Sequence, residues 1–328
     1  MELIPPWPGE MVDIGGQRLH VRSTPRGPAE TAVYVHGLAG SATNWTDLMA
    51  ELSDLVTGHA VDLPGAGYSP EPPGADYSID AHARSVTALV ERISAGPVHL
   101  FGNSMGGAIS VRIAATRPDL VRSLTLVSPA LPDLTPRYGP ARVALSAVPR
   151  LGDWAASRLS MLPPERRINA TMAMCYADLG RVHPDRLREA AEELRRRDGL
   201  PYAGESMIGS ARGLVAEYFR RGEDNLWRQA ARVTAPTLVV HGRYDRLVNP
   251  RMAARAGRTF PRVRLVLLPD AGHVAQMEVP GRVAREARQL ITESAGSAAS
   301  AGSAASAGNA GDGRSAGDAG GARSRIGE

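Results

Sequence analysis

Short apolar runs alternate with segments of helical periodicity over most of the chain. The runs cover residues 32–35, 60–63, 98–101, 124–127, 237–240 and 263–268, and glycine or proline follows each closely. Two further runs, 11–14 and 18–22, flank Gly15-Gly16, which predicts a hairpin. Continuous apolar strands separated by helices are typical of a parallel sheet covered on both faces. The pattern therefore predicts an α/β fold with a mostly parallel central sheet and helices on both faces.

Residues 131–231 interrupt this alternation. They carry helical patterns near 141–159, 165–179, 184–197 and 204–221, separated by proline and glycine, with no strand-like run between them. We interpret them as a helical lid inserted after the sixth strand, at the carboxyl edge of the sheet, where such folds bind ligands. The core domain then comprises residues 1–130 and 232–293.

The last part of the chain has a different composition. From Ser294 to Glu328 it is rich in alanine, glycine and serine and repeats in part with a period of about six. Such a tail has no apolar surface to bury, so ordering it would cost backbone entropy without compensation. We expect residues 294–328 to be disordered.

The charges do not indicate a polyanionic partner. The 38 basic residues, all arginine, are scattered among 34 acidic ones. Near 184–197, Glu192 precedes Arg196 and Glu193 precedes Arg197 by four positions, which is typical of paired charges on a solvated helix face. Because no aromatic residues interleave and no nucleic-acid motif is present, we expect no binding of nucleic acid.

Several further classes of protein and site are excluded. Cys175 is the only cysteine, so the sequence fits a reducing compartment without internal disulfides. No apolar run approaches the roughly 18 residues of a membrane-spanning helix, and the proline-rich N-terminus does not resemble a signal peptide. A cytoplasmic protein is expected. Without a zinc motif, phosphate loop or dinucleotide fingerprint, we expect neither a metal nor a cofactor. The sequence leaves the oligomeric state open.

The sharpest chemical signal is the segment Gly102-Asn103-Ser104-Met105-Gly106-Gly107, which follows a predicted strand and opens a predicted helix. A serine on a tight strand-to-helix turn needs small residues two positions before and after it, because neighbouring backbone comes close there. Gly102 and Gly106 meet this need. We therefore predict that Ser104 is a nucleophile.

A serine hydroxyl is a weak nucleophile until a base takes its proton. His273, on the loop after the strand at 263–268, is the best placed of the eight histidines; His36 and His241, each before a glycine at a strand end, are interpreted as loop-shaping residues. The base needs an acid that fixes its tautomer, and Asp245 follows the strand at 237–240. Asp270 is the rival acid, which we interpret as a turn residue.

A tetrahedral intermediate also needs hydrogen-bond donors for its oxyanion. The backbone N–H of Met105, directly after the nucleophile, and that of Leu38, in the turn after the strand at 32–35, are the predicted donors.

These motifs, in this order, resemble those of the α/β-hydrolase superfamily over about residues 11–292, lid included. The segment 62–69 is also similar to a loop that this family carries after its fourth strand. The resemblance implies a serine hydrolase of the carboxylesterase or lipase kind that works through an acyl-enzyme intermediate. Serine at position 104 argues against epoxide hydrolases and haloalkane dehalogenases, whose nucleophile is an aspartate.

One serine-dependent branch of the superfamily is a distinct alternative. Residues 102–107 and 272–278 are similar to motifs of the hydrolases that cleave a carbon–carbon bond in meta-cleavage products. Val274 stands where that branch usually has an aromatic residue, and the oxyanion turn 36–40 is shorter than usual. We therefore expect hydrolysis of esters of small to medium apolar acyl groups, with carbon–carbon cleavage of such diketones as the alternative. A third hypothesis is a non-enzymatic receptor for a small ligand.

Candidate substrate-binding residues are Asn103 and Val274, beside the nucleophile and the base, and Met172 and Tyr176 in the lid. Packing of the lid helices on one another is the competing interpretation for the large apolar residues of the lid. These are Trp154, Met161, Met172, Met174, Tyr176, Met207 and Trp227.

Overall fold

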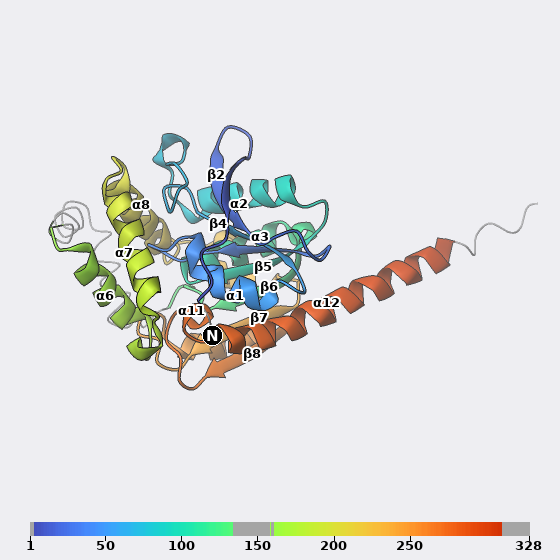
Figure 1. Ribbon diagram of the computed structural model, residues 1–328. Coiled ribbons are helices and arrows are strands. Elements are labelled where there is room, and N and C mark those ends of the chain that lie inside the picture. Colours follow the sequence, from blue (N-terminus) through green and yellow to red (C-terminus); the bar gives the residue numbers. More distant parts are fainter. Residues whose placement is uncertain (1–2, 134–157, 159–160, 310–328) are drawn as a thin grey trace, which may run out of the picture. The chain divides into compact units, whose positions relative to one another are not determined.

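The computed structural model describes residues 3–133, 158 and 161–309, so the helix predicted near 141–159 lies almost wholly outside the described residues. An eight-stranded sheet forms the centre of the fold (Figure 1). Its strands are β1 (Gly9–Asp13), β2 (Arg18–Ser23), β3 (Thr31–Val35), β4 (Thr57–Val61), β5 (Val98–Asn103), β6 (Val121–Val127), β7 (Thr237–Gly242) and β8 (Val263–Leu268).

The strand order is β1-β2-β4-β3-β5-β6-β7-β8. β2 pairs antiparallel with β1 and β4, and all the other pairs are parallel. The predicted hairpin is confirmed, because Gly15 and Gly16, with φ of 86° and 89°, make the turn between β1 and β2. The mostly parallel sheet is also confirmed.

Alternating side chains of the strands enter two separate apolar layers. On one face, Val33 and Val35 pack with residues of α2 (Ile79–Ile93), α3 (Met105–Thr116), α9 (Leu226–Ala230) and α10 (Arg251–Thr259). On the other face, Ala32 and Tyr34 pack with α1 (Thr46–Leu52), α11 (Ala275–Glu278) and the start of α12 (Pro280–Asn309). Burial of both faces explains why these strands read as continuous apolar runs.

Four described α-helices lie between β6 and β7, and three of them precede the core helix α9. These three are α6 (Pro164–Cys175), α7 (Pro184–Asp198) and α8 (Ala203–Ala216), and we call them the cap helices (Figure 1). They agree with three of the helices predicted for residues 131–231. Contacts between residues group these helices with the sheet in one compact unit, Met1–Ile291.

The prediction of disorder from Ser294 onward needs correction, because α12 continues to Asn309. The helix starts with an amphipathic segment whose buried residues include Val283 and Leu290. Once such a turn exists, each further residue adds a hydrogen bond, and alanine is the best helix former. Residues 310–328 lie outside the described residues. Within the described part of the chain, no helix is both long and apolar enough to cross a membrane.

Candidate active site

Ser104 occupies the turn between β5 and α3. Its backbone has φ 52° and ψ −118°, a conformation that a non-glycine residue rarely adopts. The turn is held by neighbouring backbone: the Ser104 N–H donates to the Val127 carbonyl at 3.1 Å, and the Ala130 N–H donates to the Ser104 carbonyl at 2.9 Å. The strained turn leaves the Ser104 side chain half-buried on the wall of a pocket.

The glycines on either side of Ser104 are required by space. A methyl group on Gly102 would lie 2.5 Å from the Gly106 carbonyl oxygen, and one on Gly106 would lie 2.2 Å from the carbonyl oxygen of Val35. Both distances are far shorter than any van der Waals contact. The sequence argument that this turn demands small residues therefore has its physical cause in the approach of α3 to β3 and β5.

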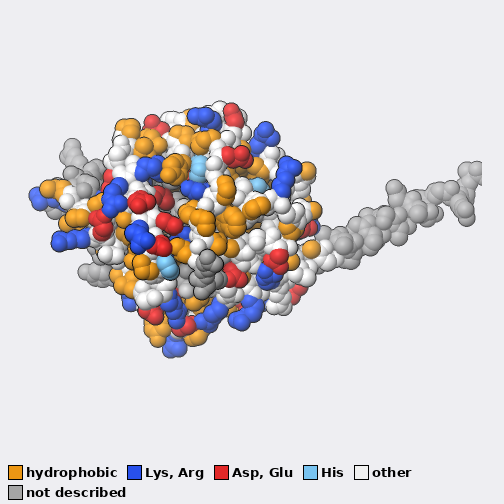
Figure 2. Space-filling model, in the orientation of Figure 1, with side chains coloured by type: hydrophobic (Ala, Val, Ile, Leu, Met, Phe, Trp, Pro, Cys, Tyr) orange, Lys and Arg blue, Asp and Glu red, His pale blue; other side chains and the backbone are white. Residues whose placement is uncertain are grey.

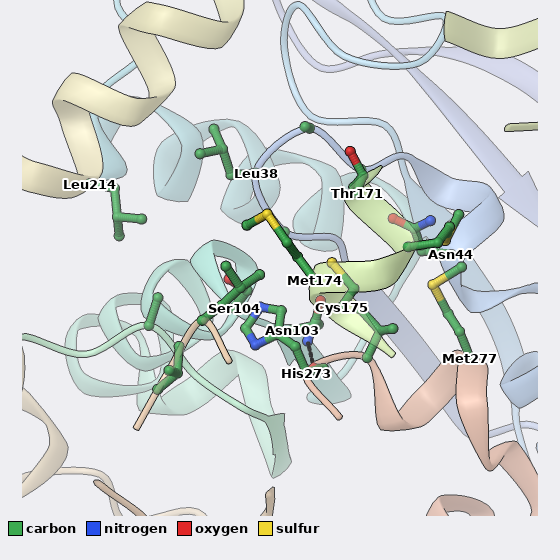
Figure 3. Close-up of a pocket in the computed structure, with 18 of the residues that line it drawn as sticks. Leu38, Asn44, Asn103, Ser104, Thr171, Met174, Cys175, Leu214, His273 and Met277 are labelled. Carbon is green, nitrogen blue, oxygen red and sulfur yellow. Dashed lines mark hydrogen bonds between the residues drawn. The ribbon is translucent and has the colours of Figure 1, made fainter. Parts of the chain in front are cut away.

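His273 lies beside Ser104 in the pocket (Figure 3). Its backbone N–H donates to the carbonyl of Cys175 at 2.7 Å, and its carbonyl accepts the Asn103 side-chain amide at 3.2 Å. The ring Nδ1 is 2.9 Å from Asp245 Oδ2. Because an ionised carboxylate only accepts hydrogen bonds, Nδ1 carries the proton in a neutral ring and Nε2 is left as an acceptor.

Asp245 is fully buried. Burial opposes its ionisation, but the charges and hydrogen bonds of His273 and His241 outweigh it and hold the pKa of this carboxyl well below its usual range. Oδ1 accepts the backbone N–H groups of Leu247 and Val248 at 2.8 and 2.9 Å, and Nε2 of His241 lies 3.2 Å from Oδ2. The carboxylate is therefore fixed in place and charged.

The turn after β3 packs directly against Ser104, since a methyl group on Gly37 would lie 3.0 Å from Ser104 Cβ. His36 braces this turn: its Nδ1 donates to the Gly37 carbonyl at 2.7 Å, and its Nε2 accepts the Leu63 N–H at 3.0 Å. Burial lowers the pKa of His36, which keeps the ring neutral and able to accept. The interpretation of His36 as a loop-shaping residue agrees with this geometry.

The two predicted oxyanion donors lie on this turn and at the start of α3. Among the described residues, neither the Leu38 nor the Met105 backbone N–H donates a hydrogen bond. Both N–H groups are thus available to an oxygen bound at Ser104, as an oxyanion hole requires.

A cavity of about 450 Å³ opens over Ser104 and His273. Most of its wall is apolar; the cap helices contribute part of it, among them Leu214 of α8, and Leu38 faces it from the turn after β3 (Figure 3). One part is polar, with Ser41, Asn44 and Arg197 in the wall. The cavity is large enough for a small organic substrate.

All four candidate substrate-binding residues line this cavity. Met172, Tyr176 and Val274 also pack on one another in a small apolar cluster, so pocket lining and helix packing are compatible roles. Asn103 uses its amide to hold the carbonyls of Val127 and His273. Of the other predicted lid residues, Met174 lines the cavity, Met161, Met207 and Trp227 do not, and Trp154 lies outside the described residues.

A family model described as "alpha/beta hydrolase fold" matches residues 33–280 of this chain. The chain belongs to this family. It is 30% identical over 266 residues to a 2-(acetamidomethylene)succinate hydrolase from Mesorhizobium japonicum, covering 80% of this chain and 87% of the relative. It is 28% identical over 266 residues to a 2-hydroxy-6-oxononadienedioate/2-hydroxy-6-oxononatrienedioate hydrolase from Cupriavidus pinatubonensis, covering 80% and 86%.

Among solved structures, a thermophilic esterase from Thermogutta terrifontis superposes on this hydrolase with a TM-score of 0.66 at 24% identity. The match covers 84% of this chain and 94% of the esterase, and at this identity it shows the shared fold.

One charge pattern of the hydrolase was misinterpreted in the sequence. Glu193 and Arg197 of α7 do not lie on a solvated face; both line the cavity. Glu193 accepts the Ser41 hydroxyl at 2.9 Å, and burial raises the pKa of its carboxyl. Figure 2 shows basic and acidic side chains intermixed over the visible face. Within α7, Arg186 pairs with Glu189 and Arg188 with Asp185, each three positions apart. The i,i+4 rule cannot tell which helix face another element covers.

Proposed function

We propose that this α/β hydrolase cleaves esters of small to medium apolar acyl groups, with Ser104 as nucleophile, His273 as base and Asp245 as the orienting acid. The observation that carries the proposal is the buried Asp245–His273 pair beside a strained Ser104, at the floor of a mainly apolar cavity. This arrangement has every part that acyl transfer requires.

The reaction proceeds in two halves. Ser104 Oγ attacks the ester carbonyl while His273 Nε2 takes the hydroxyl proton, and the oxyanion accepts hydrogen bonds from the N–H groups of Leu38 and Met105. The alcohol leaves with the proton from His273, and an acyl-serine remains. Water then attacks the acyl group, again losing its proton to His273, and the acid is released as Ser104 recovers its hydrogen.

The first experiment is turnover of a chain-length series of p-nitrophenyl esters by the native protein and by Ser104→Ala, together with covalent labelling by a fluorophosphonate. We expect loss of both turnover and labelling in Ser104→Ala, and an optimum at short to medium acyl chains. The absence of labelling in the native protein would contradict the assignment of Ser104.

A second candidate function, hydrolysis of a carbon–carbon bond in a dienoate diketone, is favoured by the polar part of the cavity. Arg197 there offers a guanidinium to a substrate carboxylate, and Asn44 offers an amide. The names of two relatives also describe hydrolases of dicarboxylates. Labelling without ester turnover, with loss of the dienoate absorbance on mixing, would move the assignment to this reaction. Labelling with neither reaction would instead favour a ligand receptor.

A further inference from the structure

Glu278, at the end of α11, is a buried carboxylate that takes no part in the triad. Its side chain is 0% exposed. Oε2 accepts the Gly272 N–H at 2.7 Å, Oε1 accepts the Asp178 N–H at 3.0 Å, and both oxygens lie within 3.2 Å of the Ala177 N–H. One carboxylate thus joins the chain just after α6 to the residue before His273.

The two segments that Glu278 joins also contact each other directly. The His273 N–H donates to the Cys175 carbonyl, and Cys175 lies beside His273 in Figure 3. A methyl group on Gly272 would lie 2.3 Å from that same carbonyl oxygen and 2.7 Å from the Ala177 nitrogen. The end of cap helix α6 and the segment that carries His273 are therefore packed together without space for an added methyl group.

A cation reinforces the same junction. Arg181, on the cap side, donates to the Asp270 carbonyl at 2.8 Å and to the Asp270 carboxylate at 3.0 Å, and its Nη1 lies 3.5 Å from Glu278 Oε1. Three backbone N–H groups donate to the Glu278 carboxylate, and the Arg181 guanidinium lies beside it. A buried carboxylate with this number of donors is costly to disturb, because the Gly272 N–H that it leaves would be buried without a partner.

We propose that Glu278 is a positioning residue that seats the cap on the catalytic loop, so that His273 is held in register with Ser104 only while the cap junction at residues 175–178 is in place. Asn103 and Asp245 hold His273 from the core side, and Glu278 fixes it from the cap side. The inference rests on the proposed function for its activity readout alone; the junction itself is independent of the substrate.

Glu278→Gln is the test, because it keeps the size of the side chain and removes one of the two acceptor oxygens. The matched control is Glu217→Gln, which changes an equally buried cap carboxylate paired with Arg112 and outside the cavity wall. We would measure kcat per labelled site, KM and the rate constant of fluorophosphonate labelling. The thermal midpoint of unfolding would be measured for the same proteins.

In Glu278→Gln we expect kcat and the labelling rate to fall about 10- to 100-fold, with KM changed less than about threefold, because the base is displaced while the cavity remains. Glu217→Gln should lower the midpoint of unfolding and keep kcat per labelled site. Equal loss of midpoint in both variants, with native kcat in both, would overturn the proposal. If the native protein labels but hydrolyses no ester, the ester assignment fails, and the labelling rate still tests Glu278.

A second measurement needs no variant and applies if Glu278→Gln does not fold. In native-state hydrogen exchange, the amides of Ala177, Asp178, Gly272 and His273 should exchange together, because they open with one junction. Rapid exchange at residues 177–178 with strong protection at 272–273 would show that the two segments move separately and would overturn the proposal.

Discussion

At the scale of single residues, the two aspartates near His273 differ in what surrounds them. Asp245 is fully buried and accepts the His273 ring at 2.9 Å. Asp270 is part-exposed and pairs with Arg181 and Arg282. Exposed ion pairs of this kind contribute little, whereas a buried carboxylate on a catalytic histidine sets its tautomer. The sequence interpretation of Asp270 as a turn residue agrees with these contacts.

We therefore expect Asp245→Asn to lower kcat by roughly 10³- to 10⁴-fold, because an amide in that place no longer selects the tautomer with a proton on Nδ1. Asp270→Asn is the control, and its kcat should stay within about twofold of native. Steady-state kinetics on the preferred ester would decide between them. A large loss in Asp270→Asn with a small one in Asp245→Asn would reverse the assignment.

At the scale of elements, Arg112 of α3 is the main link between the core and the chain after α8. Its guanidinium donates to Glu217 at 2.7 Å, to Gln229 of α9 at 3.1 Å and to the carbonyl of Asp224 at 3.1 Å, and it also pairs with Asp80 of α2. Burial raises the pKa of Glu217, while Arg112 opposes that rise. Removing the arginine would leave a buried carboxyl without its main partner.

Arg112→Met should therefore lower the free energy of unfolding by about 3–5 kcal/mol. Arg117→Met, which breaks a part-exposed cluster with Glu91 and Asp119, should cost about 1 kcal/mol or less. Urea denaturation would measure both. Similar losses in the two variants would show that burial of the Arg112–Glu217 pair does not matter, and adding Glu217→Gln to Arg112→Met should restore part of the stability.

At the scale of the whole molecule, buried histidines link stability to pH. Burial lowers the pKa of His82 and of His99 to about 4. The unfolded chain binds a proton at each near pH 6.5 and the folded chain does not, so the stability contributed by the neutral rings is lost as pH falls from about 6.5 toward 4. The raised pKa values of Glu193 and Glu217 act in the opposite direction.

This linkage is tested by comparing how the free energy of unfolding changes with pH in the native protein and in His82→Gln. Between pH 7 and pH 5, His82 alone should cost about 2 kcal/mol, so His82→Gln should reduce the pH-dependent loss by that amount. Denaturant unfolding at the two pH values measures it. If the native protein and His82→Gln lose the same free energy of unfolding between pH 7 and pH 5, His82 is protonated in the folded state at pH 5.

By itself the sequence determined the sheet and the tight turn at Ser104, because these depend on local patterns. Burial of both faces of the sheet produced the apolar runs, and a helix opens directly after Ser104, as predicted. Gly102 and Gly106 stand where neighbouring backbone comes too close for a side chain.

Only the tertiary structure decided which polar groups meet across long separations. Glu278 lies about a hundred residues after the Ala177 and Asp178 amides that it accepts, and Glu193 meets Ser41 across the cavity. No local periodicity encodes such pairs, and the i,i+4 pattern of α7 indicated the opposite environment for Glu193. The extension of α12 to Asn309 was missed because composition alone does not show that a preceding turn is already packed. Local preference fixes where an element starts, but burial by distant elements decides what each side chain contacts.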